Sequence, residues 1–188
     1  MNKQLLNKII DKKILPLSKE YDEIHAMKKN NEQLVMELNS CYRNSKEVNQ
    51  LVGQIIDQSI EDTVKISLPF YTDFGKHIEL GKNIFINQNV TFVDLGGITI
   101  EDDVLIGPMS RLVTVNHLIK PSERRGLQVK PIHIKKNAWL GANVTILPGV
   151  TVGENSIVSA DSTVTKNVPD NVIVAGTPAK ILKVIKEE

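Results

Sequence analysis

The second half of the chain places a large apolar residue at every sixth position, with two interruptions. These positions are Leu80, Ile86, Phe92, Ile100, Ile106, Leu112, Ile134, Leu140, Ile146, Val152, Val158 and Val164. A small or β-branched residue stands four positions after most of them, at Val104, Ser110, Ala138, Val144, Val150, Ser156, Ser162 and Val168. Glycine or another turn-tolerant residue often follows the large residue directly, as in Leu80-Gly81.

A period of six fits neither the 3.6-residue period of a helix nor a simple meander of hairpins. It is typical of a solenoid, in which a short strand and a turn take six residues and three such units close one triangular coil. We therefore expect the large residues to point inward. Each should stack on its equivalent one coil away, at about 4.8 Å along a parallel ladder.

Two interruptions break this rhythm. Two extra residues fall between Phe92 and Ile100, and a longer excursion occupies residues 113–131. The excursion contains the run PSERRG at residues 121–126, whose composition predicts an exposed loop.

Residues 1–62 have a helical period instead, and their apolar positions predict three helices that cover one end of the solenoid. Ser45 is expected to cap the last of them. The apolar positions are Leu5, Leu6, Ile9 and Ile10, then Leu34, Val35 and Leu38, then Val48, Leu51, Val52, Ile55 and Ile56. The expected organisation is a helical cap at residues 1–62, followed by a mainly β domain at residues 63–188 with a C-terminal tail.

The composition narrows the class of protein. Hydrophobic residues make up 41% of the chain and aromatic residues only 4%, so the core must be aliphatic. The net charge of +1 gives no reason to expect nucleic acid or an anionic membrane as the main partner. Cys41 is the single cysteine, which excludes an intrachain disulfide and a cysteine-based metal site. The start of the chain does not read as a signal peptide, and no window approaches the roughly 18 apolar residues of a membrane span, so a cytoplasmic protein is expected.

Several motifs together resemble the hexapeptide-repeat acyltransferases, and within them the maltose and galactoside O-acetyltransferase group. The resemblance runs from about Tyr21 to the C-terminus. Its most specific pieces are PFYTDFG at 69–75, VTVNH at 113–117, NAWLG at 137–141, ILPGVTVG at 146–153, VTKNVP at 164–169 and AGTPAK at 175–180. The resemblance implies a left-handed parallel β-helix, an exception to the usual right-handed crossover. It also implies a homotrimer with active sites between subunits, acetyl-CoA as co-substrate and no requirement for a metal.

His117 is the candidate catalytic base. O-acetylation needs a hydroxyl made nucleophilic near neutral pH, and a histidine offers an unprotonated form there. Position alone leaves a structural or solvated histidine as the more common alternative, but His117 matches the catalytic histidine of the family. The resemblance then implies direct attack of the acceptor hydroxyl on the thioester, without an acyl-enzyme. Cys41 lies outside every motif and is a poor nucleophile candidate.

Four polar residues match the acceptor side of the family's site. They are Asn87, Asp73, Asp22 and Asp94. Asn87 could instead be an ordinary turn asparagine, and Asp73 and Asp22 could be solvated surface carboxylates. Asp94 could orient an acceptor hydroxyl or the histidine. Its neighbour Leu95 stands where the galactoside enzyme has a second carboxylate, which argues against a galactoside acceptor.

Seven residues match the family's acetyl-CoA contacts: Trp139, Ala142, Ala160, Thr165, Lys166, Lys180 and Lys183. Small side chains at the two alanines would let a pantetheine arm approach the backbone, although simple coil packing would look the same in sequence. Thr165 and Lys166 match the nucleotide end. The two later lysines stand where arginines are frequent in relatives, and lysine keeps the charge but loses the bidentate fork. Trp139 is expected to point outward, into a groove or an interface.

Three other functions remain open on the sequence. One is an acetyltransferase of the same scaffold with an antibiotic, serine or amino-sugar acceptor. The second is a zinc enzyme like the γ-class carbonic anhydrases, for which His77, His117 and His133 lack the required close spacing. The third is a solenoid that only binds or supports other molecules. A small-molecule acceptor that is a sugar or glycoside fits the resemblance best.

Overall fold

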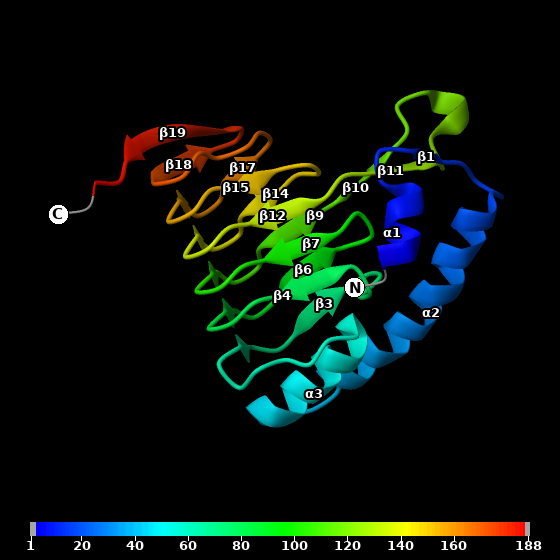
Figure 1. Ribbon diagram of the computed structural model, residues 1–188, viewed down its shortest axis with the longest axis horizontal. Helices are drawn as coiled ribbons and strands as arrows, with labels where there is room; N and C mark the ends of the chain where they lie inside the picture. The colour runs from blue at the N-terminus through cyan, green and yellow to red at the C-terminus, as the bar shows by residue number, and fades with distance from the viewer. Residues whose placement is uncertain (1–2, 187–188) are drawn as a thin grey trace.

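The six-residue repeat forms a parallel β-helix with three flat sides in the computed structural model, which describes residues 3–186 (Figure 1). Each side is one sheet, and strands that follow one another along the coil lie in different sheets. The seven-stranded sheet has the order β19 (Ala179–Val184), β18 (Val172–Gly176), β16 (Ile157–Val158), β13 (Trp139–Leu140), β8 (Leu105–Ile106), β5 (Phe85–Ile86), β2 (Lys65–Ile66). The five-stranded sheet has the order β17 (Thr163–Val164), β14 (Thr145–Ile146), β9 (Arg111–Val113), β6 (Val90–Val93), β3 (Phe70–Thr72). The four-stranded sheet has the order β15 (Thr151–Val152), β12 (Ile132–Ile134), β7 (Ile98–Ile100), β4 (Ile78–Leu80).

The inward stacking predicted from the repeat is confirmed. Ile86, Ile106, Leu140 and Val158 are partners in consecutive strands of the seven-stranded sheet and form one vertical stack. All twelve large repeat residues are buried, with exposed fractions of 7% or less. The small residues four positions later are buried as well. Because burial of aliphatic side chains is the main favourable term in folding, this continuous core is the main source of stability of the coil.

The turns between the flat sides rely on asparagine and aspartate. Most of the non-glycine residues with positive φ are Asn or Asp in coil turns, which tolerate this backbone region better than other residues do. Their side chains also bond from one coil to the next. The Asn143 amide donates to Asp161 at 2.7 Å, and Asn137 donates to Asn155 at 2.9 Å. The turns therefore add polar ladders that run parallel to the apolar stacks.

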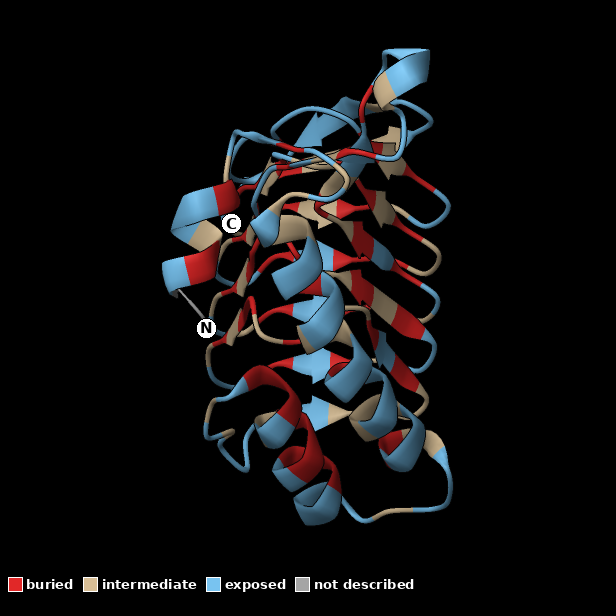
Figure 2. Cartoon of the chain, turned by 90° about the vertical axis from the view of Figure 1, so that its right-hand side faces the viewer, coloured by how far each residue is buried: buried red, intermediate tan, exposed pale blue. Residues whose placement is uncertain are grey.

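Helices close one end of the coil. Helix α3 (Ser45–Ile56) buries its predicted apolar face in the coil core, as Figure 2 shows along this helix. Its cap is Asn44 rather than the predicted Ser45, and Glu47 completes a capping box. Helix α2 (Lys19–Asn39) crosses the side of the coil, and helix α1 (Lys3–Ile9) lies beside it. No helix within residues 3–186 is long and apolar enough to cross a membrane.

The excursion predicted as an exposed loop is a β-hairpin. Strands β10 (Val115–His117) and β11 (Leu127–Val129) pair antiparallel on either side of the short helix η1 (Pro121–Glu123). A strand from the helical region that the sequence did not predict, β1 (Lys13–Ile14), joins them to make a third sheet. We call residues 115–129 the His117 hairpin. It projects from the edge of the coil beside α1 and α2 (Figure 1).

Candidate active site

His117 lines a cavity between the His117 hairpin and helix α2. The cavity has a volume of about 350 Å³ and lies at the edge where the five-stranded sheet turns into the four-stranded sheet. Its wall is formed by Tyr21, Ile24, His25, Lys28, Asp73, Phe74, Val93, Leu95, Val115, His117, Arg125 and Leu127. His117 also borders a second hollow on the outer side of the hairpin, next to Lys120 and Gln128. Its imidazole is therefore reachable from two sides.

The backbone of the hairpin fixes the proton on the His117 ring. Nδ1 of His117 lies 2.8 Å from the carbonyl oxygen of Arg124. A carbonyl oxygen can only accept, so Nδ1 must carry the hydrogen and donate it. Nε2 of the neutral ring is then left with a free lone pair, which is the form that a general base requires.

Asp73 lies in the same cavity in an unusual electrostatic setting. Its Oδ1 accepts the backbone N–H of Asp94 at 3.1 Å, and its Oδ2 lies 3.6 Å from the ammonium of Lys28. Burial, and then the negative charge of Asp94, raise the pKa of Asp73 to about 6, while Lys28 opposes this rise. A carboxylate with such a pKa changes its charge near neutral pH.

Asp94 does not line the cavity, because its carboxylate is fully buried behind it. Oδ1 accepts the Thr72 hydroxyl at 2.5 Å and the backbone N–H groups of Phe74 and Gly75 at 3.1 and 3.0 Å. Oδ2 accepts the backbone N–H of His77 at 3.2 Å. These bonds hold the loop that carries Asp73. The partner that orients His117 is the Arg124 carbonyl, so the suggestion that Asp94 orients the histidine is wrong.

Another group of predicted residues lies at a different edge of the coil. Asn87, Ala142 and Ala160 each lie in a turn that leads from the seven-stranded to the five-stranded sheet. Trp139 lies next to this edge, on the outer face of β13. The five-stranded sheet separates this edge from the cavity of His117. Within one chain, the structure does not bring these four residues to His117.

A β-bulge places the two C-terminal lysines on one face. Lys180 lies opposite Ala175 and Lys183 opposite Ile173, although a spacing of three residues would normally point them to opposite faces. The pairing shifts between Ile173 and Val174, which leaves Leu182 as the extra residue. Because Ile173 follows Ile157 and Trp139 in register, Lys183 ends the row that contains Trp139.

The remaining predicted residues are exposed and separate. Thr165 and Lys166 follow β17, at the same edge as the cavity of His117 but farther along the coil. Asp22 lies on the exposed side of α2 and is absent from the cavity wall. His77 is buried, with Nδ1 2.6 Å from the Leu95 carbonyl, and His133 pairs with Glu101 at 2.6 Å. The three histidines of the zinc alternative thus have different partners within one chain.

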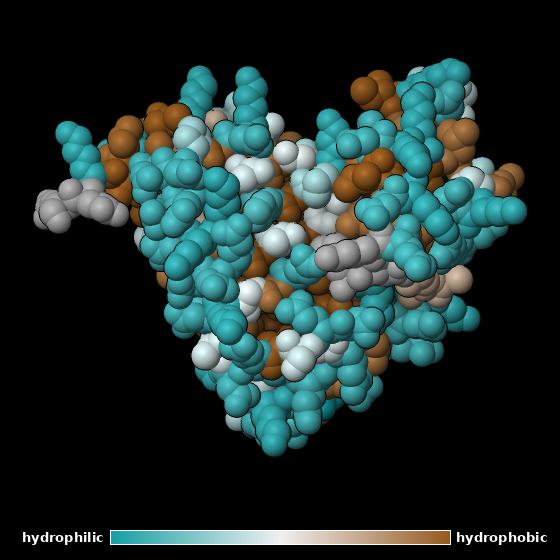
Figure 3. All heavy atoms as spheres, viewed as in Figure 1, coloured by the Kyte–Doolittle hydropathy of each residue, from teal (hydrophilic) through white to brown (hydrophobic). Residues whose placement is uncertain are grey.

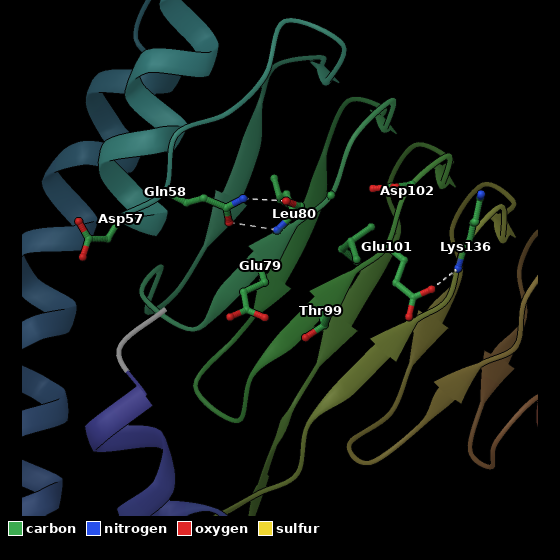
Figure 4. Close-up of a pocket in the computed structure, with 10 residues that line it drawn as sticks. Asp57, Gln58, Glu79, Leu80, Thr99, Glu101, Asp102 and Lys136 are labelled. Atoms are coloured by element: carbon green, nitrogen blue, oxygen red, sulfur yellow. Dashed lines mark hydrogen bonds between the residues drawn. The ribbon is translucent and has the colours of Figure 1, made fainter.

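A more acidic hollow of about 580 Å³ lies on the outer face of the four-stranded sheet, beside the end of α3 (Figure 4). Its carboxylates already have structural partners. Glu101 accepts the backbone N–H of Lys136 at 2.8 Å, and Asp102 accepts that of Lys82 at 2.8 Å. The Gln58 side chain bonds both the N–H and the C=O of Leu80. This hollow contains none of the predicted site residues and reads as a set of turn caps.

Comparison with known proteins agrees with this geometry. Residues 131–166 match the family model "Bacterial transferase hexapeptide (six repeats)". A hexapeptide-repeat acetyltransferase of Vibrio cholerae, solved with acetyl-CoA, is 33% identical, with a TM-score of 0.83 over 97% of this chain and 99% of that chain. A maltose O-acetyltransferase of Clostridium difficile is 26% identical, with a TM-score of 0.88 over 98% of this chain and 97% of that one. The galactoside O-acetyltransferase of Lactococcus lactis is 42% identical over 65% of this chain and 60% of that relative.

The chain belongs to the hexapeptide-repeat acetyltransferases. As an acetyltransferase, it has cavity residues that the sequence reasoning missed, namely Tyr21, His25, Lys28 and Arg125. The first three lie with Ile24 on one face of α2, at positions i, i+3, i+4 and i+7. This helical spacing was readable in the sequence. What could not be read was that this face, unlike that of α3, meets the His117 hairpin and not the coil core.

Proposed function

We propose that this acetyltransferase moves the acetyl group of acetyl-CoA to a hydroxyl of a sugar or glycoside, with His117 as the general base. The observation that carries the proposal is the 2.8 Å contact from Nδ1 of His117 to the Arg124 carbonyl, because it leaves Nε2 as the basic nitrogen. Nε2 takes the proton of the acceptor hydroxyl as the oxygen forms its bond to the acetyl carbon. The imidazolium then returns the proton to the leaving sulfur.

Acetyl-CoA supplies the electrophilic thioester carbon when it is bound. The residues present suit such an extended, anionic ligand. Ala142 and Ala160 occupy equivalent turns of successive coils, where the backbone is accessible beside small side chains. Lys180 and Lys183 share a face at the end of the same sheet, where they can meet phosphate groups. Thr165 and Lys166 would extend this contact toward the nucleotide.

We further propose that the active site forms between copies of the chain in a homotrimer. Asn87, Trp139 and the two alanines lie at one edge of the coil and His117 at the next, so one chain holds two incomplete halves. The outer face of the seven-stranded sheet also carries an apolar row, with Phe85, Leu105 and Trp139 exposed by 38%, 46% and 48%. The four-stranded sheet presents polar residues such as Thr99 and His133 instead. An exposed apolar row of this kind favours burial against another subunit.

The cavity suits a polyhydroxylated acceptor. Asp73 offers a carboxylate that can accept a hydroxyl hydrogen bond, and Lys28 offers a donor beside it. Tyr21 and His25 stack against each other with ring centroids 4.3 Å apart, so they present aromatic surface to the same space. In this arrangement Asn87 and Asp22 contact the acceptor from outside the cavity wall, and Asp94 acts by holding the loop of Asp73.

The test is an acceptor panel in which release of free CoA thiol is followed with purified protein. Maltose, glucose and a galactoside are compared with glucosamine, serine and a hydroxylated antibiotic, and the product is identified as an ester or an amide by mass. Turnover that depends on a sugar hydroxyl supports the proposal. Preferential turnover of a non-sugar acceptor would reassign the substrate, and absence of turnover with every acceptor would contradict it.

A further inference from the structure

Three residues from distant parts of the sequence form one row beneath the candidate base. Ile14 of β1 lies directly opposite Leu127 of β11, and Leu127 lies directly opposite His117 of β10. Residues opposite each other in an antiparallel sheet are the closest cross-strand neighbours. The N-terminal strand is thus two strands from the base, and one side chain lies between them.

The His117 hairpin is bound to the coil only at its two ends. Thr114 donates its backbone N–H to Val93 at 2.9 Å, and Lys130 donates to Thr114 at 3.0 Å. Between these points, the hydrogen bonds found among the described residues stay within the hairpin or go to β1. The backbone of the coil therefore does not itself hold the strand that carries His117.

A separate apolar cluster supports the hairpin. It consists of Leu5, Ile9, Ile14, Ile24, Phe74, Leu95 and Val129, with Tyr21, Met27, Val115 and Leu127 packed against it. None of these residues belongs to the core of the coil. Three of the seven buried members come from residues 5–14, so the N-terminal segment supplies a large share of this cluster. Because the two cores are distinct, the hairpin can detach without unfolding of the coil.

Backbone and charge contacts join the same two segments. A Cβ added to Gly126 would lie 3.0 Å from the Ile14 carbonyl oxygen and 2.7 Å from Leu118, so the turn of the hairpin closes directly on β1. The ammonium of Lys13 lies 3.4 Å from Glu123, which also binds Lys120 at 2.9 Å. The hydrogen bonds from Lys120 and then from Lys13 lower the pKa of Glu123, so both ion pairs persist at neutral pH.

We propose that residues 3–14 form a strap that holds His117 in its working position, with Ile14 and Lys13 as positioning residues. Catalysis then requires the docked strap, and turnover is proportional to the fraction of molecules in which it is docked. The groups proposed to bind acetyl-CoA lie on coils outside this cluster, so strap release should lower kcat and leave the affinity for acetyl-CoA intact. The turnover part of this inference rests on the proposed function, whereas docking of the strap can be measured without turnover.

The experiment uses full-length protein and a graded series, Ile14→Val, Ile14→Ala and Ile14→Asp. Amide hydrogen exchange of residues 115–129 reports docking, and the amides of the strands β13 to β17 report the coil. We expect exchange of the hairpin to accelerate along the series, by about 10-fold or more for Ile14→Ala, with the coil amides unchanged. Turnover should stay near wild type for Ile14→Val and fall at least about 10-fold for Ile14→Asp, since a buried charge opens most molecules. Leu17→Asp is the matched control, because Leu17 lies just after the strap and is 90% exposed.

A cross-link separates positioning from general damage. Lys13 and Gln128 are direct partners across β1 and β11, at a separation that a disulfide can span. In a Cys41→Ser background, Lys13→Cys and Gln128→Cys are combined with Ile14→Asp. Oxidation should restore both hairpin protection and turnover, and reduction should abolish both again.

Three results would overturn the strap. One is unchanged hairpin exchange in Ile14→Asp, and another is free exchange with full turnover. The third is failure of the oxidised cross-link to restore turnover together with hairpin protection. If the wild type turns over no acceptor at all, the proposed function fails, and the exchange measurements still decide whether residues 3–14 hold the hairpin.

Discussion

Asp73 and Asp94 are linked by a hydrogen bond from the backbone N–H of Asp94 to Oδ1 of Asp73, at 3.1 Å. The two carboxylates have different tasks. Asp94 is buried and holds the loop over residues 72–77, whereas Asp73 faces the cavity of His117. The loop is therefore fixed by one carboxylate in a way that places a second one at a partly dry position, where its charge is costly.

The pKa of Asp73 makes stability depend on pH between about 4 and 6. The folded protein has a pKa of about 6 at this group, against an ordinary value of 3.8, so it binds the proton more tightly than the unfolded chain does. The free energy of unfolding should therefore fall as the pH rises through this window, by at most roughly 3 kcal/mol, and should level off above it. Asp73→Asn should remove this slope in urea unfolding at pH 4, 5, 6 and 7.

Asp170→Asn is the control for this measurement. A hydrogen bond from the Glu154 backbone and one from Lys135 lower the pKa of Asp170, so its contribution has the opposite sign and disappears only as the pH falls below the ordinary range. Its replacement should leave the slope between pH 4 and 6 in place. An identical pH dependence in wild type and Asp73→Asn would show that Asp73 titrates as an ordinary surface carboxylate.

Replacement of His117 by alanine should reduce turnover by about 10²–10⁴-fold, because the acceptor hydroxyl loses its base. Thermal unfolding should change little, since the ring is exposed and its one hydrogen bond goes to the Arg124 carbonyl within the same hairpin. His133→Ala is the matched control: His133 is paired with Glu101 on the four-stranded sheet, away from the cavity. Equal loss of turnover in the two variants would point to general damage and not to base catalysis.

The repeat predicted the coil well because its information is local. A period of six specifies which side chains face inward whatever the rest of the chain does, and residues such as Leu140 and Val158 are buried as expected. The role of the glycines was less visible. Gly107 does not have a positive φ; a Cβ there would lie 2.5 Å from the backbone of Gly141 in the next coil. Close approach of neighbouring coils, and not turn conformation, requires glycine there, and that spacing is a property of the assembled fold.

The site was only half readable for a related reason. The motif around His117 pointed to the base, but its orienting partner is a backbone carbonyl, which every residue has and no sequence pattern marks. Strand β1 was missed because two residues, Lys13 and Ile14, form it only against β11, more than a hundred positions later. Pairings of this kind depend on tertiary contacts and not on local propensity.

The apolar row on the seven-stranded sheet predicts the oligomeric state. Leu105→Glu places a charge in the middle of this row, between Phe85 and Trp139, and should convert a trimer into monomers in light scattering at micromolar concentration. Thr99→Glu, on the outer face of the four-stranded sheet, should leave the trimer intact. A wild-type protein that is monomeric at these concentrations would contradict an active site shared between copies. Figure 3 shows that apolar side chains also gather over β18 and β19, at the end of the same sheet.

The bulge at Leu182 gives a prediction for the donor side. Because it turns Lys180 and Lys183 to the same face, both ammonium groups can meet phosphates of one bound nucleotide. Lys180→Ala and Lys183→Ala should each weaken acetyl-CoA binding by roughly 3- to 10-fold in calorimetry, with a smaller effect at high salt. Lys82→Ala, which removes a lysine paired with Glu61 near the opposite end of the coil, serves as the control for net charge. If Lys180→Ala binds acetyl-CoA as tightly as the wild type, Lys180 lies outside the site. Deleting Leu182 provides the stricter test, because it keeps both lysines and removes the bulge that aligns them. A loss of affinity in that deletion would show that the shared face of the two lysines, and not only their charge, holds the nucleotide.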